Sequence, residues 1–356
     1  MQSLDEKTWD AIELDSMFTF ERGKEKNMAS LIQGHIPLVS ARKVNNGIKG
    51  FVDNPAKVIK GGNVISLNND GDGGAGLAYY QPVDFALDTH VTALHPKKDV
   101  STDALLCMTA SISKQHAVFG HGRSISLPRA HRIQNMLPVT NFGEPDYEYM
   151  AEYTRQKREA MLSKYRSYVE ERIVELGDPV EIPALDEKEW REFRIGELFE
   201  VSRPVVRNKD DYRAGDVPFV ASGSVNNGVM KLCEPFEGER LDDGCCITVS
   251  PVDGSTFFQP MDFLGRGGAG SSILMLRCSG LNLYRGQFMA RAIQQTCSKY
   301  TYGHMGNKDS IKRERIMLPI TDSGKPDYKY MEQYAKNMML RKYQQYLAFL
   351  DRSDNA

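Results

Sequence analysis

The stretch MLPVTNFGEPDYEYMAEY, residues 136–153, occurs twice in this chain of 356 residues. It returns as MLPITDSGKPDYKYMEQY at residues 317–334, an offset of 181. The same offset relates LDEKTW at 4–9 to LDEKEW at 185–190, and IPLVSARKVNNG at 36–47 to VPFVASGSVNNG at 217–228. Three matches at one offset indicate two copies of a unit of about 170 residues. Because solenoid repeats are only about 20–50 residues long, this period predicts two whole domains.

Each copy is predicted to end in a long helix. Pro145-Asp146 and Pro326-Asp327 are helix start signals, since proline suits the first turn and aspartate caps free N–H groups. Behind them, side chains repeat at spacings of 3 and 4 residues, which predicts helices over about 147–175 and 328–351. The two stripes are Met150, Tyr153, Lys157, Met161, Tyr165 and Tyr168, and Met331, Tyr334, Met338, Lys342, Tyr346 and Phe349.

The rest of each copy is predicted to be rich in strands. Short apolar runs are broken by Gly, Asn, Asp and Pro, which is typical of a compact β-rich α/β domain. The runs are HIPLVSA, NVISLNN and THVTALH in the first copy, and DVPFVAS, CCITVSP and SSILMLR in the second. We therefore expect a domain at 1–144, a helix at 145–177, a linker at 178–184, a second domain at 185–325 and a final helix with a tail at 326–356.

Composition narrows the class of protein. The chain is 41% hydrophobic and 26% charged, with a net charge of −2, as in an ordinary globular protein without a global positive field. The N-terminus has no signal-peptide pattern, and no apolar run is long enough to span a bilayer. Six cysteines form no C-x-x-C pair, which argues against a disulfide framework and a structural zinc site. We expect a cytoplasmic protein without a membrane partner.

NNDGDGGAGLAYY, residues 68–80, contains G-x-G-x-x-G and half of a calcium loop. A dinucleotide site would need a helix directly after the glycines, but an aromatic, proline-broken segment follows. The calcium pattern has Tyr79 where a bidentate glutamate is required. Shifted by 181, only Asp72-Gly73 has a counterpart, Asp253-Gly254, and Gly71 and Gly76 have none. The stretch therefore predicts a β-turn and no ligand site.

Residues for chemistry on DNA are missing from the sequence. The seven histidines form no H-x-x-x-H pair, and neither an adenine-methyltransferase motif of the form [DN]-P-P-[YF] nor a convincing nuclease motif is present. We expect no catalytic residues, no metal site and no cofactor in this chain.

The repeated architecture resembles the specificity subunit of type I restriction–modification systems, and in its compactness that of the related type IIB systems. The resemblance covers almost the whole chain and rests on the paired W-start, VNNG, MLP and PDY motifs, and on YYQP at 79–82, which becomes FFQP at 257–260. One departure is that VDFALDTH (83–90) is poorly matched by MDFLGRGG (261–268). The implied fold class is α/β (α+β): two tandem β-rich target-recognition domains, each followed by a long helix, with the helices paired as an antiparallel coiled-coil spacer.

The resemblance also implies a function. Each domain would read half of a bipartite, asymmetric site in double-stranded DNA. Partner modification (methyltransferase) subunits, alone or with restriction subunits, would bring S-adenosylmethionine and Mg²⁺ and flip out the target adenine. This chain would then be a non-catalytic specificity subunit. A stand-alone tandem DNA-binding or inhibitory protein without a methyltransferase partner would share the same sequence pattern.

Basic and amide side chains on loops are the expected DNA contacts, because they bind phosphates and read base edges. An ordinary Asn-Gly turn explains VNNG equally well, and a solvated loop charge explains each single basic residue. The expected contacts are Arg42, Lys43, Asn45, His121 and Arg123 in the first copy, and Arg203, Arg207, Asn226, Tyr302, His304, Asn307 and Lys308 in the second.

The helical stripes suit a helix pair and partner docking. Packing of the two stripes against each other alone would explain the same pattern. The expected partner-binding residues are Met150, Tyr153, Met161 and Tyr165 on the first helix, and Met331, Tyr334, Met338 and Tyr346 on the second.

Overall fold

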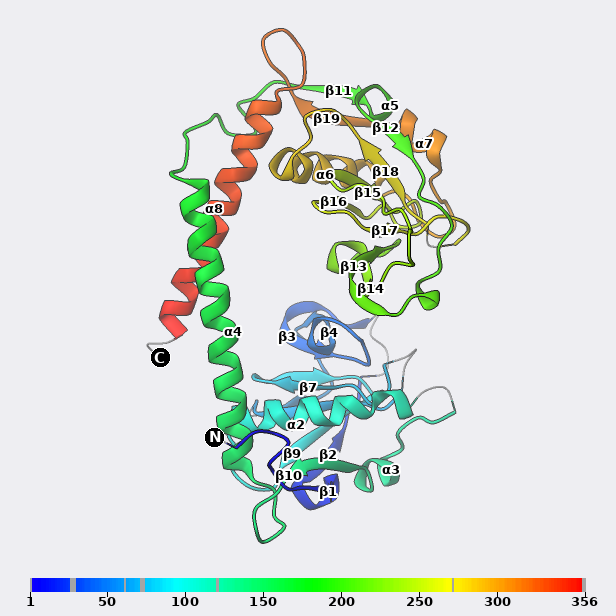
Figure 1. The fold of residues 1–356 in the computed structure, drawn as a ribbon. Coiled ribbons are helices and arrows are strands. Elements are labelled where there is room, and N and C mark those ends of the chain that lie inside the picture. The colour runs from blue at the N-terminus through cyan, green and yellow to red at the C-terminus, as the bar shows by residue number, and fades with distance from the viewer. Residues whose placement is uncertain are drawn as a thin grey trace. The chain divides into compact units, whose positions relative to one another are not determined.

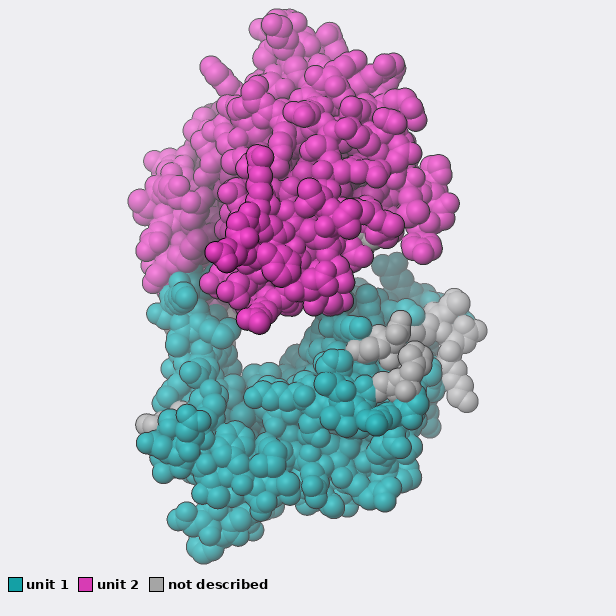
Figure 2. Space-filling model, turned by 45° about the vertical axis from the view of Figure 1, so that its right-hand side comes forward, with its two compact units in different colours: residues 1–165 teal, residues 166–356 magenta. Residues whose placement is uncertain are grey.

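The computed structural model describes residues 2–25, 30–60, 62–70, 74–119, 122–270 and 272–353. The chain forms two compact units, residues 1–165 and 166–356 (Figure 2). Their boundary lies inside the helix α4, Tyr147–Leu176. The helix is shared because Met150 near its start is buried in the core of unit 1, whereas Val169 near its end is buried within unit 2.

The elements of unit 1 follow one another in the order strand, helix, strands, helices, strand, long helix (Figure 1). They are β1 Trp9–Glu13, α1 Leu14–Met17, β2 Phe18–Arg22, β3 Gln33–Val39, η2 Asn45–Gly47, β4 Ile48–Val52, β5 Val58–Ile59, β6 Val64–Asn68, β7 Ala78–Gln81, β8 Phe85–Leu87, β9 Val91–Pro96, α2 Thr102–Lys114, η3 Gln115–Val118, α3 Leu127–His131, β10 Gln134–Pro138 and the first part of α4.

Two four-stranded sheets and helix α2 form the main part of unit 1. Strands β2, β9, β6 and β7 form an antiparallel sheet, and β4, β3, β8 and β5 form a second sheet in which β3 and β8 run parallel. Helix α2, capped by the Ser101 hydroxyl, packs on the first sheet, and its Leu105, Met108 and Ile112 share a buried core with Ile65 of β6. The predicted β-rich α/β domain is confirmed, although the sequence reasoning did not place α2.

Unit 2 repeats this plan. Its elements are β11 Trp190–Arg194, α5 Ile195–Leu198, β12 Glu200–Ser202, η4 Lys209–Asp211, β13 Ala214–Val220, η5 Asn226–Gly228, β14 Val229–Cys233, β15 Cys246–Val249, β16 Thr256–Gln259, β17 Leu264–Gly265, β18 Leu274–Arg277, α6 Leu283–Cys297, α7 Lys308–Arg313, β19 Arg315–Pro319 and α8 Tyr328–Ser353. Strands β12, β18, β15 and β16 form the sheet that α6 covers, and β14, β13 and β17 form the second sheet.

The repeated LDEK-x-W and PDY motifs fasten the start of each copy to the start of its long helix. In unit 1, Lys7 pairs with Asp146 at 2.6 Å and lies over the Tyr149 ring. In unit 2, Lys188 pairs with Asp327 at 3.0 Å in the same way. Both aspartates also accept a backbone N–H from the helix three residues on, as an N-cap does. The opening strands pair with the MLP strands, β1 with β10 and β11 with β19.

The long helices pair in an antiparallel manner. Within unit 2, Arg166 of α4 binds Asp351 at 2.9 Å, and the Tyr168 ring meets the Tyr343 ring edge-on, so later residues of α4 lie beside earlier residues of α8. The expected helices over about 147–175 and 328–351 are therefore confirmed, with the observed bounds Tyr147–Leu176 and Tyr328–Ser353. In the described ranges, no helix is both long and apolar enough to cross a membrane.

Candidate nucleic-acid interface

Four loops of unit 1 lie together at one end of its sheets. The Asn68 amide donates to the Arg42 carbonyl oxygen at 3.0 Å, which joins the end of β6 to the loop 41–47. The Asn69 N–H donates to the His90 carbonyl at 2.9 Å, and the Ile125 N–H donates to the Asn69 carbonyl at 2.6 Å. These bonds bring in the β8–β9 loop and the loop before α3. Their gathering forms one irregular surface, the type of surface that carries binding residues on a rigid scaffold.

The matching loops of unit 2 are joined in two pairs. The Ser222 hydroxyl donates to the Ser272 carbonyl oxygen at 2.7 Å, which joins the loop 222–228 to the glycine-rich segment before β18. The Gly306 N–H donates to the Pro251 carbonyl at 2.7 Å, which brings in the loop before α7. We call the surface formed by these loops the loop end of each unit.

The two loop ends differ in shape. The same backbone hydrogen bond closes one turn in each unit: the Gly76 N–H donates to the Asn68 carbonyl, and the Gly254 N–H donates to the Ser250 carbonyl. The closed turn contains residues 69–75 in unit 1 but only residues 251–253 in unit 2. The loop before β9 and β18 differs in length in the opposite sense, because residues 89–90 of unit 1 correspond to residues 267–272 of unit 2. This exchange explains why VDFALDTH and MDFLGRGG align poorly. It also corrects the fixed-offset reading, since Gly76 does match Gly254, and both have left-handed φ values, +83° and +71°.

The turn interpretation of Asp253-Gly254 is confirmed by this geometry, and the Asp253 carboxylate accepts the Ser255 N–H at 3.0 Å. Its proposed partner in the first copy, Asp72-Gly73, lies outside the described residues, as does Gly71.

VNNG forms the same locked turn in both units. Asn46 and Asn227 have left-handed φ values of 53° and 56°, which asparagine tolerates. Their amides donate to the carbonyls of Tyr80 and Phe258, and Gln81 and Gln259 of the Q-P motifs donate back to the asparagine carbonyls at 3.1 and 3.0 Å. The second asparagine is therefore structural, and the ordinary-turn explanation of VNNG applies to it.

The first asparagine of each turn, Asn45 and Asn226, lies exposed at the tip of the loop. Lys43 and Arg123 are also exposed on the loop end of unit 1, whereas Arg42 is half-buried and donates to the Ile48 carbonyl at 3.2 Å. His121 lies outside the described residues.

In unit 2, Tyr302 is 85% exposed, and His304 and Lys308 are exposed beside it. Asn307 is exposed too, but its side chain accepts the N–H groups of Asp309 and Ser310 and caps α7. It therefore has a structural role in addition to any contact that it makes. Arg203 is exposed on the segment before β13.

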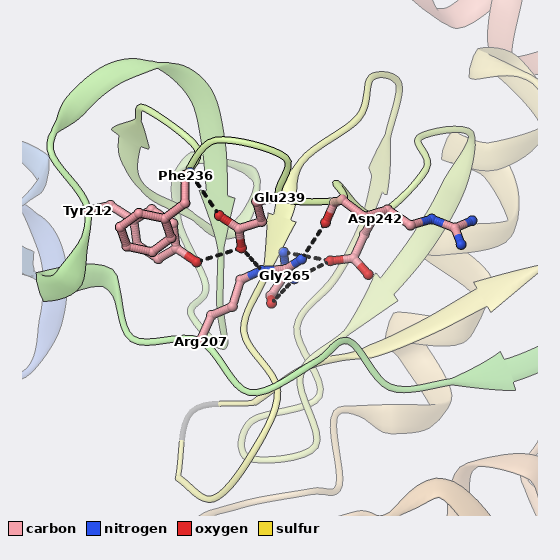
Figure 3. A network of polar contacts seen from close by, with 7 residues as sticks. Arg207, Tyr212, Phe236, Glu239, Asp242 and Gly265 are labelled. Carbon is pink, nitrogen blue, oxygen red and sulfur yellow. Dashed lines mark hydrogen bonds and ion pairs between the residues drawn. The ribbon is translucent and has the colours of Figure 1, made fainter.

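Arg207, which the sequence suggested as a DNA contact, lies in a buried ion-pair network instead. It is only 7% exposed, and its guanidinium binds Glu239 at 2.8 Å and Asp242 at 2.6 Å (Figure 3). It also donates to the carbonyls of Arg240 and Gly265. Four of the five guanidinium N–H groups are thus engaged within the protein and the side chain is buried, so we remove Arg207 from the candidate contacts.

The protonation of this network agrees with its geometry. Burial lowers the pKa of Arg207, but the bonds to Glu239 and Asp242 outweigh burial and raise it. Burial raises the pKa of Glu239, but the Arg207 and Tyr212 hydrogen bonds outweigh it, so the pKa falls below the usual value. Burial and the Glu239 hydrogen bond raise the pKa of Tyr212 to about 12. The network fastens the segment 203–208 to β17 and to the loop that carries Glu239 and Asp242.

Sequence reasoning missed residues at both loop ends. Arg266 begins the longer loop of unit 2, and its Nε atom is buried without a hydrogen-bond partner. Asn68 Oδ1 and Ser250 Oγ, at matching positions of the two units, are likewise buried without partners. In unit 1, a hydrogen bond to Asp70 raises the pKa of His90. Such exceptions to ordinary hydrogen-bond satisfaction are expected at functional sites.

The expected partner-binding residues divide into three groups by exposure. Met150 and Met331 are fully buried in the cores of units 1 and 2, so they pack the domains and offer no surface to a partner. Met161 is 72% exposed, and Tyr165 is 42% exposed. Tyr153, Tyr334, Met338 and Tyr346 are half-buried.

No cluster of His, Cys, Asp and Glu suited to a metal ion occurs in the ranges that the structure describes. The cysteines at 107, 233, 245, 246, 278 and 297 are all free thiols, and burial raises the pKa of Cys246 and Cys297 to about 12.

Two copies of one β-rich domain, each with polar loops at one end and each closed by a long helix, define a tandem recognition protein. The family model described as "Type I restriction modification DNA specificity domain" matches residues 6–161 and 187–346. The chain belongs to this family. It is a DNA sequence recognition subunit of a restriction–modification complex.

One relative is similar over nearly the whole chain. The specificity subunit of the type II restriction enzyme BcgI from Heyndrickxia coagulans is 27% identical over 335 residues, 91% of this chain and 93% of the relative. Two solved structures are also similar. The S subunit of a type I system from M. genitalium is 13% identical, with coverage of 99% and 94% and a TM-score of 0.47. The HsdS subunit from Thermoanaerobacter tengcongensis is 12% identical, with coverage of 97% and 91% and a TM-score of 0.31. The family assignment rests on the sequence matches.

Replacing Arg266 by alanine should weaken binding to a duplex that carries the protein's site by about 1–3 kcal/mol, the usual value of a specific arginine contact. Binding is measured by fluorescence anisotropy at several salt concentrations. The control is Arg315→Ala, which removes an exposed arginine that pairs with Glu192 between β19 and β11. Equal affinities for both variants would exclude Arg266 from the interface.

Proposed function

We propose that the chain reads one bipartite, asymmetric site in double-stranded DNA. Residues 1–144 would read one half and residues 185–325 the other. The proposal is carried by a repeated framework with different loops. The Lys–Asp ion pairs and the hydrogen bonds of the VNNG turns match residue by residue in the two units. Of the loops at the loop ends, one is four residues longer in unit 1 and the next is four residues longer in unit 2. Two domains that share one fold but differ in their loops are suited to reading two different DNA sequences.

Charge supports the same asymmetry. The loop 41–47 carries Arg42 and Lys43, where the matching loop 222–228 has Gly223 and Ser224. In the loop after β8 and β17 the positive charge is instead in unit 2. Arg266 of unit 2 and Asp88 of unit 1 occupy equivalent backbone positions, because each donates its N–H to the last residue of the neighbouring parallel strand. Cationic side chains thus stand on different loops of the two units, and the two half-sites should differ in sequence.

We further infer that catalysis belongs to partner subunits. Modification subunits, alone or with restriction subunits, would bind S-adenosylmethionine and Mg²⁺ and act on the target adenine. The missing methyltransferase and nuclease motifs support this division, and the relative from H. coagulans carries the name of a specificity subunit. A cytoplasmic location would follow from the same role. The loop-end residues Arg42, Lys43, Asn45, Arg123, Arg203, Asn226, Tyr302, His304, Asn307 and Lys308 remain the proposed DNA contacts, with Arg266 added.

Exchanging residues 1–144 for a different recognition domain of the family should change one half-site and leave the other unchanged. The reason is that each loop end is built within its own unit. The variant and the unmodified chain are each co-expressed with the modification subunits, and methylated positions are mapped on genomic DNA. A palindromic site with identical halves, or a simultaneous change of both halves, would contradict the proposal. A site bound by the chain but never methylated in co-expression would favour a stand-alone DNA-binding or inhibitory protein.

A further inference from the structure

An exposed ion pair between His90 and Asp70 lies on the loop end of unit 1. The His90 Nδ1–H donates to the Asp70 carboxylate, at 2.8 Å from Oδ1 and 3.0 Å from Oδ2. Asp70 lies two residues after β6 and His90 directly before β9, so the pair joins the ends of two neighbouring strands. The side chains are 59% and 42% exposed, and exposed ion pairs contribute little to stability. The fold of unit 1 therefore does not depend on this pair.

The backbone and one ring nitrogen of His90 are fixed by the protein. The His90 N–H donates to the buried Asp88 carboxylate at 3.0 Å, and the His90 carbonyl accepts the Asn69 N–H at 2.9 Å. Asp70 accepts from Nδ1 and so orients the ring. The hydrogen bonds of the described residues leave Nε2 without a partner. His90 therefore presents Nε2, in a set orientation, to a partner outside the chain.

The charges around the ring favour its protonated form. The hydrogen bond to Asp70 raises the pKa of His90, and burial opposes this rise. The Asp70 and Asp88 charges raise the pKa further, whereas the charge of Arg22, whose guanidinium donates to the Ile125 carbonyl, lowers it. A protonated ring donates from both nitrogens, but a neutral ring that keeps its Nδ1–H on Asp70 has an acceptor at Nε2. The donor at Nε2 is therefore present below the pKa of His90 and is lost as the pH rises through it.

Unit 2 has a residue that does not titrate at the place of His90. This residue is Ser272, which is only 8% exposed and whose carbonyl accepts the Ser222 hydroxyl. The acidic residue of the matching turn, Asp253, accepts the Ser255 N–H within its own turn. A pH effect that arises from His90 therefore belongs to unit 1 alone.

We propose that His90 and Asp70 together read one G·C base pair in the half-site of unit 1, with protonated His90 donating from Nε2 to guanine and Asp70 accepting from cytosine. This inference rests on the proposed function, because it assigns one base pair to a loop end that reads DNA. In the major groove guanine offers two adjacent acceptors, N7 and O6, which suit a cationic donor. Cytosine offers its N4 amine, which suits an aspartate. Adenine suits the pair less well, because its acceptor N7 lies beside a donor.

The test is a selection from a library of DNA duplexes of random sequence, at pH 6 and at pH 9, with sequencing of the bound duplexes. The protein is the full chain co-purified with its modification subunits, without S-adenosylmethionine. The variant His90→Gln removes the titratable ring. The matched control is His131→Gln, because His131 pairs with Asp15 at 2.6 Å in the same unit. Lys97, at the end of β9 remote from His90, bonds to the Asp15 carbonyl oxygen, so the control pair lies away from the loop end.

At pH 6 the unmodified chain and the control should prefer G·C to A·T by at least about tenfold at one position of one half-site. At pH 9 this preference should be at least about fivefold smaller, since one linked proton changes binding by up to about tenfold per pH unit. In His90→Gln the preference should be reduced at pH 6 and should no longer depend on pH. The other half-site should be the same in all three proteins.

The variant Asp70→Asn separates positioning of the ring from a structural role. It removes the charge that raises the pKa of His90, so the preference for guanine should decline at a lower pH than in the unmodified chain. A selection at pH 7.5 should therefore show a weaker preference in Asp70→Asn than in the control. An identical pH profile in Asp70→Asn and the unmodified chain would contradict the role of Asp70.

Three results would overturn the inference while the proposed function stands. They are an unchanged pH dependence in His90→Gln, a preference for another base pair at the position that His90→Gln alters, and a loss of binding in His90→Gln that is equal for all sequences. The last result would indicate a phosphate contact in place of base reading. Selection of no bipartite sequence by the unmodified chain would overturn the proposed function, and this inference with it.

Discussion

Replacing Arg207 by methionine should lower the free energy of unfolding of unit 2 by about 3–5 kcal/mol, the usual cost of leaving a buried charge without its partner. Glu239 would keep its carboxylate with only the bonds from the Tyr212 hydroxyl and the Phe236 N–H, and Asp242 with the bond from the Gly265 N–H, so both would lose their cationic partner. Methionine fills similar space, so the loss reflects charge and hydrogen bonding more than packing. Because the network fastens the segment 203–208 to β17, the half-site read by unit 2 should be methylated poorly.

The two tryptophans allow the measurement to be assigned to one unit. Trp9 lies in unit 1 and Trp190 in unit 2, so a Trp9→Phe background reports unit 2 by fluorescence during urea unfolding. Arg203→Met is the matched control, since Arg203 is an exposed arginine on the same segment, and it should change stability by less than about 0.5 kcal/mol. Adding Glu239→Gln and Asp242→Asn to Arg207→Met should recover part of the loss, because neutral side chains no longer need the guanidinium. A loss below about 1 kcal/mol for Arg207→Met would show that the network is not structural.

The pH dependence of the stability loss in Arg207→Met follows from the protonation of Glu239. Its pKa in the folded chain is depressed, so its contribution to stability is present above the unfolded value and is lost as the pH falls through the folded value. In Arg207→Met the carboxylate lacks its partner and gains stability when it takes up a proton. The difference between variant and unmodified chain should therefore shrink as the pH is lowered from 7 toward about 4.

Much of the fold could be read from the sequence because it is written twice. The repeated PDY signals placed the starts of both long helices at Tyr147 and Tyr328, and the apolar runs located β3, β6 and β9 with their counterparts. Helices α2 and α6 were missed although their signals were present: Ser101 caps α2, and Leu105, Met108 and Ile112 follow helical spacing. The surrounding short strands led to a β interpretation of the whole region.

The candidate site was harder to predict because it depends on contacts between distant segments. Arg207 stands in a polar segment, VVRNKDD, that is typical of an exposed loop, and its burial follows from Glu239 and Asp242, 32 and 35 residues later. The alignment of the two loop ends failed for a similar reason. Two length changes of four residues and opposite sign cancel, so the offset is 182 both at Asn68–Ser250 and at Val91–Ile273, and the difference between the loops is hidden. Only the hydrogen bonds that close each turn identify Gly76 with Gly254.

Inserting four residues after Ala160 should lengthen the gap between the two half-sites by one or two base pairs. Ala160 is an exposed residue of α4, and α4 is continuous from Tyr147 to Leu176 across the boundary between the units. Four helical residues add about 6 Å and turn the distal part by about 40°. At about 3.4 Å per base pair, 6 Å is close to two base pairs. No loop-end residue is touched, so the identities of both half-sites should persist.

The comparison that decides this expectation is an insertion of the same four residues after Asp178, in the exposed linker beyond α4. There the end of α4 remains paired with α8 through Tyr168 and Tyr343, so a longer linker should leave the gap unchanged. Both variants are co-expressed with the modification subunits and their methylated sites are mapped. Methylation lost only in the Ala160 variant, with the subunits no longer co-purifying, would mean that α4 also docks the partner. An assembled, active complex with the original gap would show that α4 does not set the spacing, and the distance between half-sites would then have to be fixed by the partner subunits.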